Sequence, residues 1–393
     1  MRSSNTRYLV GLDHLRGFGA ILIVFYHALH VLSFGVRAGT GDPSQFWVHT
    51  LNPFIALIEE GHTSVALFMV LSGFVFSVAA EGREIAYWPF VKNRFLRVYP
   101  LYIVVMLAGL AALPSAYSPP AMFQALLFQA NYAGALNLPP YSSMFWAVAV
   151  EFQFYLLFPF LHRFIERYGA RWIMSSIALF ILLRFCAATT SSSPRDVSYW
   201  HLIARLDQFL LGMWSARLFS RWELRNVPWG LITLVCGACV ATMLVAFNQL
   251  GGFPAQGYWK VAWPTIEGLG WASVLLSYTA FAKRMPALIS KPLAALGTVS
   301  YSVYLLHFVC LMIVPRWIPL WTSDSPNVTS QLYALGVILP ILLPLSALSY
   351  YAVERPFLNM RVRYLRDLPA VPAEIASVRP AANASSVSDA SAS

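Results

Sequence analysis

Ionisable side chains lie on one face of an apolar segment near the amino terminus. Asp13 and Arg16 are three residues apart, so a helix would place them side by side as an ion pair. His27 follows Arg16 by eleven residues and returns to the same face about 16 Å along the helix axis. A lone histidine in such a segment is more often a packing residue. The aligned stripe of Asp13, Arg16 and His27 favours a catalytic function instead.

A pair of arginines forms a second group, in the stretch KNRFLRVYPLY. Arg94 and Arg97 are three residues apart in what the sequence predicts to be a loop before a membrane span. They could anchor the protein at the membrane surface together with nearby tyrosines such as Tyr102. Two guanidinium groups on one face would equally form a clamp for phosphate or pyrophosphate. The sequence leaves both interpretations open.

A third group centres on Glu151, which lies among aromatic residues in MFWAVAVEFQFYLLFPFL. A buried acid must be paired or protonated, so Glu151 is a candidate to orient His27 or exchange a proton with it. Tyr155 lies four residues further on, on the same helical face. Ser72 in VLSGF and His307 in SYSVYLLHF are also polar within apolar stretches, and packing explains each of them about as well as function does.

Transmembrane helices are the elements that must position these groups. The chain of 393 residues is 58% hydrophobic and only 11% charged, whereas soluble domains are about 25% charged. The sequence therefore predicts an all-α fold, a polytopic transmembrane helical bundle of about ten helices. The predicted spans are residues 12–34, 54–80, 99–115, 142–162, 172–190, 200–219, 229–249, 259–281, 297–319 and 331–353. A short re-entrant or interfacial helix is expected within the proline-rich stretch 115–142.

The basic residues predict the orientation of this bundle. A net charge of +10 would also suit a nucleic-acid partner, but most arginines and lysines lie in alternate inter-span segments, which is typical of the cytoplasmic side. The opposite segments hold only Arg37, Arg195, Lys260 and Arg316. We therefore expect no nucleic-acid partner, a multi-pass protein in the lipid bilayer, and both termini in the cytoplasm.

Two further segments carry simpler predictions. Residues 368–393 are rich in alanine and serine, so we expect a disordered cytoplasmic tail after a transmembrane domain spanning residues 1–367. Cys236 and Cys239 form a C-x-x-C pair within the apolar run LVCGACV, without a second pair of ligands nearby. Packing explains these cysteines, and no metal site is expected.

In their order along the chain, these motifs resemble the acyltransferase 3 family, the membrane O-acyltransferases of the bacterial O-antigen and exopolysaccharide acetylase type. The resemblance covers about residues 8–360. It rests on LDHLRGFGAILIVFYH with Arg16 and His27, LFMVLSGF, RFLRVYP with Arg94 and Arg97, AVEFQFYLLFP, SYSVYLLH and the closing ERP. The chain departs from the family pattern at His14, where glycine is commoner, and at Phe152, where a second glutamate often follows the first.

The resemblance implies transfer of an acyl group, most often acetyl, from cytosolic acyl-CoA to a hydroxyl of a sugar, glycan or other acceptor. Arg94 and Arg97 would then hold the phosphates of acyl-CoA, and Arg16 would stabilise the thioester oxygen or the cofactor. His27 would act as the base, or carry the acyl group in a covalent intermediate. The residues expected to contact acyl-CoA include Tyr102, Tyr155, His307 and Ser72.

The resemblance also bears on location and partners. We expect the inner membrane of a bacterium and, as partners, the glycan acceptor and other enzymes of a polysaccharide pathway. The SGNH-type domain appended in some relatives is not expected here, so the bundle would act alone or pass its acyl group to a separate protein. A transporter or flippase for a lipid-linked or sugar substrate is the main alternative, because such proteins also carry charges within their spans. A signalling or scaffold protein is a weaker one.

Overall fold

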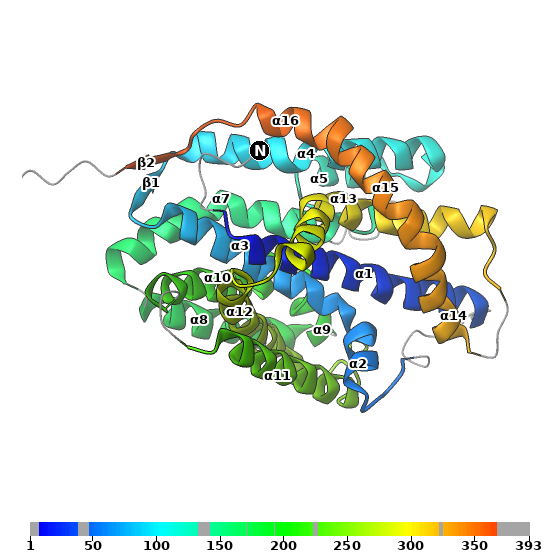
Figure 1. The fold of residues 1–393 in the computed structure, drawn as a ribbon, viewed down its shortest axis with the longest axis horizontal. Helices are drawn as coiled ribbons and strands as arrows, with labels where there is room; N and C mark the ends of the chain where they lie inside the picture. The colour runs from blue at the N-terminus through cyan, green and yellow to red at the C-terminus, as the bar shows by residue number, and fades with distance from the viewer. Residues whose placement is uncertain are drawn as a thin grey trace, which may run out of the picture.

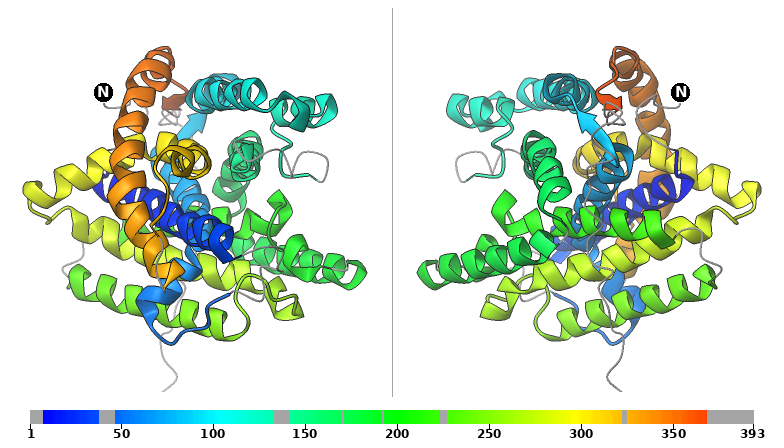
Figure 2. Two further views of the ribbon diagram at one scale, coloured as in Figure 1. Left: turned by 90° about the vertical axis from the view of Figure 1, so that its right-hand side faces the viewer. Right: turned by 90° about the vertical axis from the view of Figure 1, so that its left-hand side faces the viewer.

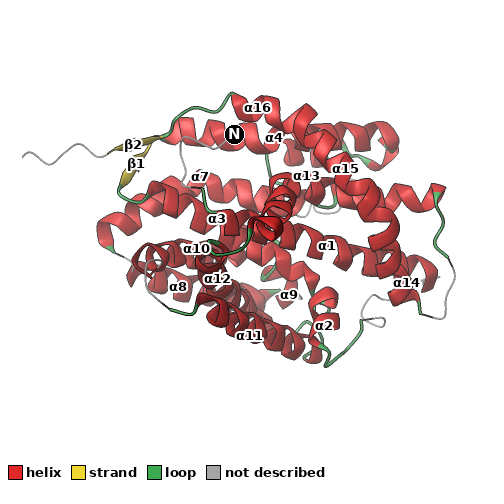
Figure 3. Ribbon diagram, viewed as in Figure 1, coloured by secondary structure: helices red, strands yellow, loops and turns green. Residues whose placement is uncertain are grey.

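The computed structural model describes residues 8–37, 47–132, 142–169, 171–191, 193–222, 227–321 and 325–367. Nearly all of this described chain is helical (Figure 3). The main helices are α1 (Val10–Arg37), α3 (Ser64–Ala80), α4 (Tyr87–Ala112), α7 (Phe145–Tyr168), α8 (Arg171–Thr190), α10 (Leu202–Trp222), α11 (Trp229–Gln249), α12 (Trp263–Ala282), α13 (Ala287–Trp317) and α15 (Leu339–Ser349).

Shorter elements connect or extend these helices. They are α2 (Pro53–Glu59), α5 (Pro119–Leu126), α9 (Pro194–Val197), α14 (Pro326–Tyr333), α16 (Arg355–Asn359), the 3₁₀ turns η2 (Gly61–Thr63), η3 (Pro114–Ala116) and η5 (Tyr258–Val261), the π turns η6 (Ala334–Ile338) and η7 (Tyr350–Glu354), and the strands β1 (Arg83–Ile85) and β2 (Leu365–Asp367). α5 confirms the short helix predicted within 115–142. The predicted tail at 368–393 lies outside the described residues.

The predicted fold class is confirmed. Eight helical segments of the described chain are long and apolar enough to cross a membrane. The two remaining predicted spans correspond to α10 and α12, which have 21 and 20 residues. These two helices are more polar because they carry the buried ion pair of Arg205 with Glu267. Each of the ten predicted spans therefore overlaps at least one helix.

Two predicted boundaries are wrong. α4 begins at Tyr87, so Arg94 and Arg97 lie within a helix instead of a loop before it. Hydropathy marks only the lipid-spanning part of a helix, while lysine and arginine are good helix formers and extend it beyond the bilayer. The predicted span 54–80 is two helices, α2 and α3, separated by η2. Asn52 starts α2 as an N-cap, because its side chain accepts hydrogen bonds from the backbone N–H groups of Phe54 and Ile55.

α1 lies near the middle of the bundle (Figures 1 and 2). In these views α4, α5 and α16 lie on one side of it, and α8, α11 and α12 lie on the other. α1 packs most extensively against α13. In this central position the α1 side chains contact several neighbouring helices. α1 is therefore suited to hold a site in the bundle interior.

Glycine permits the close approach of α1 and α13. A Cβ atom on Gly297 would lie 2.0 Å from the carbonyl oxygen of Asp13, so only glycine fits there. The two helices run parallel, since Asp13 lies at Gly297 and His27, further along, contacts His307. Parallel directions are expected for the first and ninth spans of the predicted topology.

The contacts of His14 explain why this chain has a histidine where glycine is commoner in the family pattern. Its ring is buried between three helices, with Nδ1 3.0 Å from the hydroxyl of Tyr278 on α12 and Nε2 2.9 Å from the carbonyl oxygen of Ser290 on α13. The imidazole therefore cross-links α1 to both neighbours and fixes the amino-terminal end of α1.

Two strands close the predicted cytoplasmic end of the bundle. β1 and β2 pair antiparallel, with Arg83 opposite Asp367 and Ile85 opposite Leu365. The side chain of Asn93 on α4 continues this contact: its amide nitrogen donates to the carbonyl of Val362 at 2.7 Å, and its oxygen accepts from the N–H of Val362 at 2.9 Å. The segment 361–367 is thereby held against the start of α4.

The contact between α1 and α13 predicts the effect of adding one methyl group. Gly297→Ala should destabilise the protein by about 1–3 kcal/mol, because the Cβ would overlap the α1 backbone and separate the helices. Gly237→Ala on α11 is the matched control, since nothing lies within 4 Å of its Cβ position. Heat inactivation and aggregation of the detergent-solubilised variants would measure this. Equal behaviour of the two variants would contradict the proposed close packing.

Candidate functional site

Two histidines meet in the interior of the bundle. Nδ1 of His27 on α1 lies 3.0 Å from Nε2 of His307 on α13, and the ring centroids are 5.1 Å apart. His307 is fully buried, whereas His27 is partly exposed. The sequence identified both residues but assigned His307 to acyl-CoA and gave no sign that it contacts His27.

Backbone carbonyls determine which nitrogen atoms carry protons in this pair. Nδ1 of His307 lies 3.2 Å from the carbonyl oxygen of Val303, which can only accept, so this nitrogen is the donor. Nε2 of neutral His307 is then an acceptor and receives the proton of His27 Nδ1, which also lies 3.1 Å from the carbonyl of Ile23. His27 Nε2 is left with a lone pair and no hydrogen-bond partner in the described chain. It can therefore act as a base.

Glu151 does not contact His27 among the described residues, contrary to the orienting role predicted for it. It accepts a hydrogen bond from Ser72 on α3 and another from Tyr155, one turn further along α7. The side chains of Ser72 and Tyr155 are both largely buried. The sequence therefore identified a real polar group but assigned it the wrong neighbour, because sequence spacing does not show which helices are adjacent.

Arg94 lies against three aromatic rings. Its guanidinium carbon is 4.8 Å from the ring centroid of Phe76, 5.6 Å from that of Phe90 and 5.9 Å from that of Tyr155. Its Nε is buried and has no hydrogen-bond partner among the described residues. The aromatic rings hold the side chain in place and leave the guanidinium available to an anion.

Arg97 is already paired. Its Nη1 lies 2.7 Å from a carboxylate oxygen of Glu354, which is only 1% exposed and also accepts a hydrogen bond from Ser302. Its guanidinium also lies over the ring of Tyr301 on α13. Arg97 thus ties α4 to α13 and η7, so it has a structural role whatever else it binds. The glutamate of the closing ERP motif is the residue that neutralises it.

A third arginine joins these two and was not singled out in the sequence. Arg361 follows α16, and its pKa is lowered by burial and by the guanidinium groups of Arg94 and Arg97. We call Arg94, Arg97 and Arg361 the cationic cluster. Glu354 pairs with Arg97 in this cluster, and Glu151 lies nearby, hydrogen-bonded to the Tyr155 whose ring faces Arg94. The sequence shows Arg361 only as one of many cytoplasmic charges, whereas the contact of Asn93 with the adjacent Val362 holds this part of the chain against α4.

The remaining predicted site residues have other contacts. Asp13 and Arg16 form the predicted ion pair at 3.0 Å, which confirms that expectation. Tyr102 is fully buried: its hydroxyl donates to the carbonyl of Ala125 at 2.8 Å, and its ring stacks on that of Phe145. Tyr102 therefore holds α5 against α4 and α7 and exposes no atom to a ligand.

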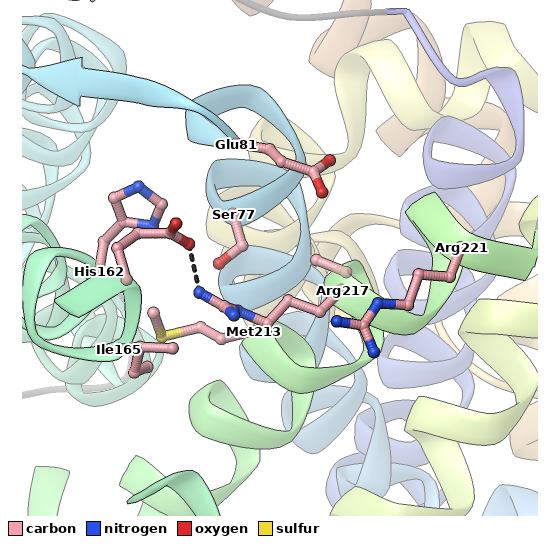
Figure 4. Close-up of a pocket in the computed structure, with 9 residues that line it drawn as sticks. Ser77, Glu81, His162, Ile165, Met213, Arg217 and Arg221 are labelled. Carbon is pink, nitrogen blue, oxygen red and sulfur yellow. Dashed lines mark hydrogen bonds and ion pairs between the residues drawn. The ribbon is translucent and has the colours of Figure 1, made fainter. Parts of the chain in front are cut away.

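A separate pocket of about 530 Å³ opens at the same end of the bundle, between the ends of α3, α7 and α10 (Figure 4). Its two arginines are balanced by two acids. Arg217 pairs with Glu166, drawn as the dashed line, and Glu81 accepts a hydrogen bond from Ser220. The cationic cluster has the greater excess of positive charge, so it is the better site for a phosphorylated ligand.

Comparison with known proteins shows which family this chain resembles. A family model described as an acyltransferase domain matches residues 9–349. O-acetyltransferase OatA of Staphylococcus aureus (strain NCTC 8325 / PS 47) is 25% identical over 92% of this chain and 59% of its own length. Acyltransferase MdmB of Streptomyces mycarofaciens is 26% identical over 64% of this chain and 68% of its own length. The chain thus spans about three fifths of the staphylococcal relative. No solved structure matches it significantly.

The burial of Glu354 predicts a stability difference between two ion pairs. Glu354→Gln should destabilise the protein by about 3–5 kcal/mol, because Arg97 would keep its charge in a buried site without a counter-charge. Glu166→Gln removes an ion pair of partly exposed side chains and should cost less than about 1 kcal/mol. Thermal unfolding in detergent would compare the two. A larger loss for Glu166→Gln would show that Glu354 does not neutralise a buried charge.

Proposed function

Because this chain belongs to the family of acyltransferase domains, we propose that it is a membrane O-acyltransferase. The donor is cytosolic acyl-CoA, with acetyl-CoA as the first choice, and the acceptor is a hydroxyl of a glycan. The observation that carries the proposal is the unpaired Nε2 of His27 in the interior of a helical bundle, held by His307. The O-acetyltransferase relative supports the class of reaction.

His27 acts as the general base. Its Nε2 takes the proton of the acceptor hydroxyl while the hydroxyl oxygen bonds to the thioester carbonyl carbon. The carbon–sulfur bond then breaks, and the CoA sulfur leaves with the proton that the imidazolium returns. His307 is a positioning residue in this scheme, because it accepts the hydrogen bond from Nδ1 and keeps the lone pair of His27 on Nε2.

The donor is held at the predicted cytoplasmic end. Arg94 and Arg361 contact the phosphates of acyl-CoA, with Arg97 contributing charge while it remains paired to Glu354. Arg16 is about 16 Å from His27 along α1, too far for both residues to reach one thioester group. Of its two predicted roles, binding of the cofactor is therefore the compatible one.

The acceptor approaches from the opposite side of the membrane. The predicted topology places the carboxyl-terminal ends of α1 and α13 outside, beyond His27 and His307. A membrane enzyme with its donor site inside and its acceptor side outside is suited to the envelope glycans of a bacterium. A transporter or flippase would need no acyl-CoA, so the requirement for that donor separates the two functions.

Substitution of His27 and His307 tests whether His27 is the general base and whether His307 positions it. His27→Ala should lower kcat by a factor of about one hundred to ten thousand, the usual contribution of general-base catalysis. His307→Ala should lower kcat with little change in the KM for acyl-CoA, and His307→Gln should recover part of the loss because its amide oxygen can still accept from His27 Nδ1. Transfer of label from acetyl-CoA to glycan in membranes measures this. Wild-type turnover by His27→Ala would remove His27 from the mechanism.

Substitution in the cationic cluster tests the donor site. Arg94→Ala and Arg361→Ala should each raise the KM for acyl-CoA by about ten-fold, the effect of losing one charge-assisted hydrogen bond. Arg366→Ala, an exposed arginine in the same carboxyl-terminal segment, is the matched control. An unchanged KM in both cluster variants would leave these arginines as anchors at the membrane surface.

A further inference from the structure

Five helices enclose the interior of the bundle as a closed ring. α1 packs against α13 and α3, α7 packs against α3 and α4, and α4 packs against α13. Each helix of the ring directs a partly exposed side chain at a neighbouring helix of the ring: His27, Phe68, Arg94, Glu151 and Tyr301. Exposed surface inside a ring of packed helices indicates space between them. We call this space, from Arg94 to His27, the passage.

The exposed surface of Glu151 faces the passage and not the lipid. Gln153 lies about 200° further around α7, on the opposite side, where it bonds to the segment that follows α5. Phe160 is exposed on the outer surface of the helix. Glu151 shares its face with Tyr155 and Phe158, whose rings contact aromatic rings of α3 and α4. The carboxyl group is therefore directed into the ring of helices.

Glu151 lies one helical turn outward from Arg94. The guanidinium of Arg94 lies against the rings of Phe76 on α3 and Tyr155 on α7. Ser72, four residues before Phe76, donates a hydrogen bond to Glu151, which in turn is four residues before Tyr155. Both helices run from the predicted outer side to the cytoplasmic side, so four residues backwards is a step of about 6 Å outward. The two helices give the same order independently.

The next turn outward reaches the two histidines. Phe68 lies four residues before Ser72 on the same face of α3, and its ring centroid is 6.2 Å from that of Tyr304 on α13. The ring centroid of Tyr304 is in turn 5.9 Å from that of His307. Glu151 therefore lies between the cationic cluster and the pair of histidines, about one helical turn from each level.

Glu151 has acceptor capacity that the described chain does not use. A carboxylate offers about four acceptor positions, and two hydroxyls, those of Ser72 and Tyr155, donate to it. It forms no ion pair with a described residue. The nearby hydroxyls of Tyr301 and Tyr304 donate instead to backbone carbonyls on α4 and at the start of α7. Glu151 is thus a fixed acceptor, open to a donor that enters the passage.

Acyl-CoA brings such a donor to this depth. With its phosphates at the cationic cluster and its thioester at His27, the pantetheine arm of acyl-CoA must cross the level of Glu151. The arm is a chain of carbon atoms interrupted by two amide groups. An amide N–H that leaves water for an apolar surrounding is costly unless it finds an acceptor. A carboxylate is a strong acceptor for it, and the rings of Phe68 and Tyr301 suit the carbon atoms of the arm.

We propose that Glu151 accepts a hydrogen bond from an amide N–H of the pantetheine arm. This inference rests on the proposed function. Ser72 and Tyr155 orient the carboxyl group for this contact, so Glu151 selects donors that carry the arm and takes no part in proton transfer at His27. A ligand role also accounts for an acid that stays inside an apolar bundle without a cation beside it.

Two ligands that differ only in the arm test this contact. Coenzyme A has the arm, whereas 3′-phospho-ADP keeps the phosphates of coenzyme A and lacks it. Titration calorimetry of the detergent-solubilised full chain measures the Kd of each. Glu151→Gln preserves the size of the side chain and an oxygen for Ser72. Glu166→Gln is the matched control, because it makes the same change on the same helix but at the ion pair with Arg217.

We expect Glu151→Gln to raise the Kd for coenzyme A about ten-fold, the effect of losing one charge-assisted hydrogen bond. Its Kd for 3′-phospho-ADP should equal that of the wild type, which also shows that the variant is folded. Glu166→Gln should bind both ligands as the wild type does. An equal loss for both ligands in Glu151→Gln would show a structural role, and an unchanged Kd for coenzyme A would show no contact. Either result overturns the inference.

Binding and transfer together separate this inference from the proposed function. If wild-type membranes transfer acetyl from acetyl-CoA while Glu151→Gln binds coenzyme A normally, the function stands and the contact with the arm fails. If Glu151→Gln weakens only coenzyme A while His27→Ala transfers acetyl at the wild-type rate, the contact stands and the base assignment fails. If the wild-type protein binds no coenzyme A, the donor assignment and this inference fail together.

Discussion

The close contact between α1 and α13 is the constraint on which the site depends. A glycine at position 297 brings the two backbones together beside Asp13. Because both helices are rigid and run in the same direction, this contact near their amino-terminal ends also sets their register further along. His27 and His307 meet as a result. The contact between His27 and His307 therefore depends on the absence of a Cβ atom at Gly297, near the predicted cytoplasmic end.

Buried charge organises the rest of the bundle. Arg184 pairs with Asp207, Arg205 pairs with Glu267 and Arg97 pairs with Glu354, in each case joining different helices. Charges in an apolar bundle must be paired, so these contacts restrict how the helices can be arranged. Polar atoms that remain unpaired are then more informative than the pairs. Arg94 retains one such atom, its Nε, beside its aromatic rings.

Much of this structure could be predicted from the sequence, for reasons that are local. Hydropathy identifies the spans because the bilayer fixes the length of apolar segments. Helical spacing identifies the pair of Asp13 and Arg16 because both residues lie on one helix. The His307 contact and the neighbours of Glu151 depend on which helices touch, and no spacing along the chain contains that information. Arg361 was overlooked for the same reason, since its place depends on pairing between β1 and β2.

The pairing of β1 with β2 also has a consequence for biosynthesis. The strand at 83–85 is made early, but its partner at 365–367 leaves the ribosome nearly three hundred residues later. The third arginine of the cationic cluster and the histidine that holds His27 both come from late segments. A nascent chain with its first helices already inserted therefore lacks part of the proposed donor site and the contact that orients the proposed base. Under the proposed function, acyl-CoA in the cytoplasm would meet only the completed site.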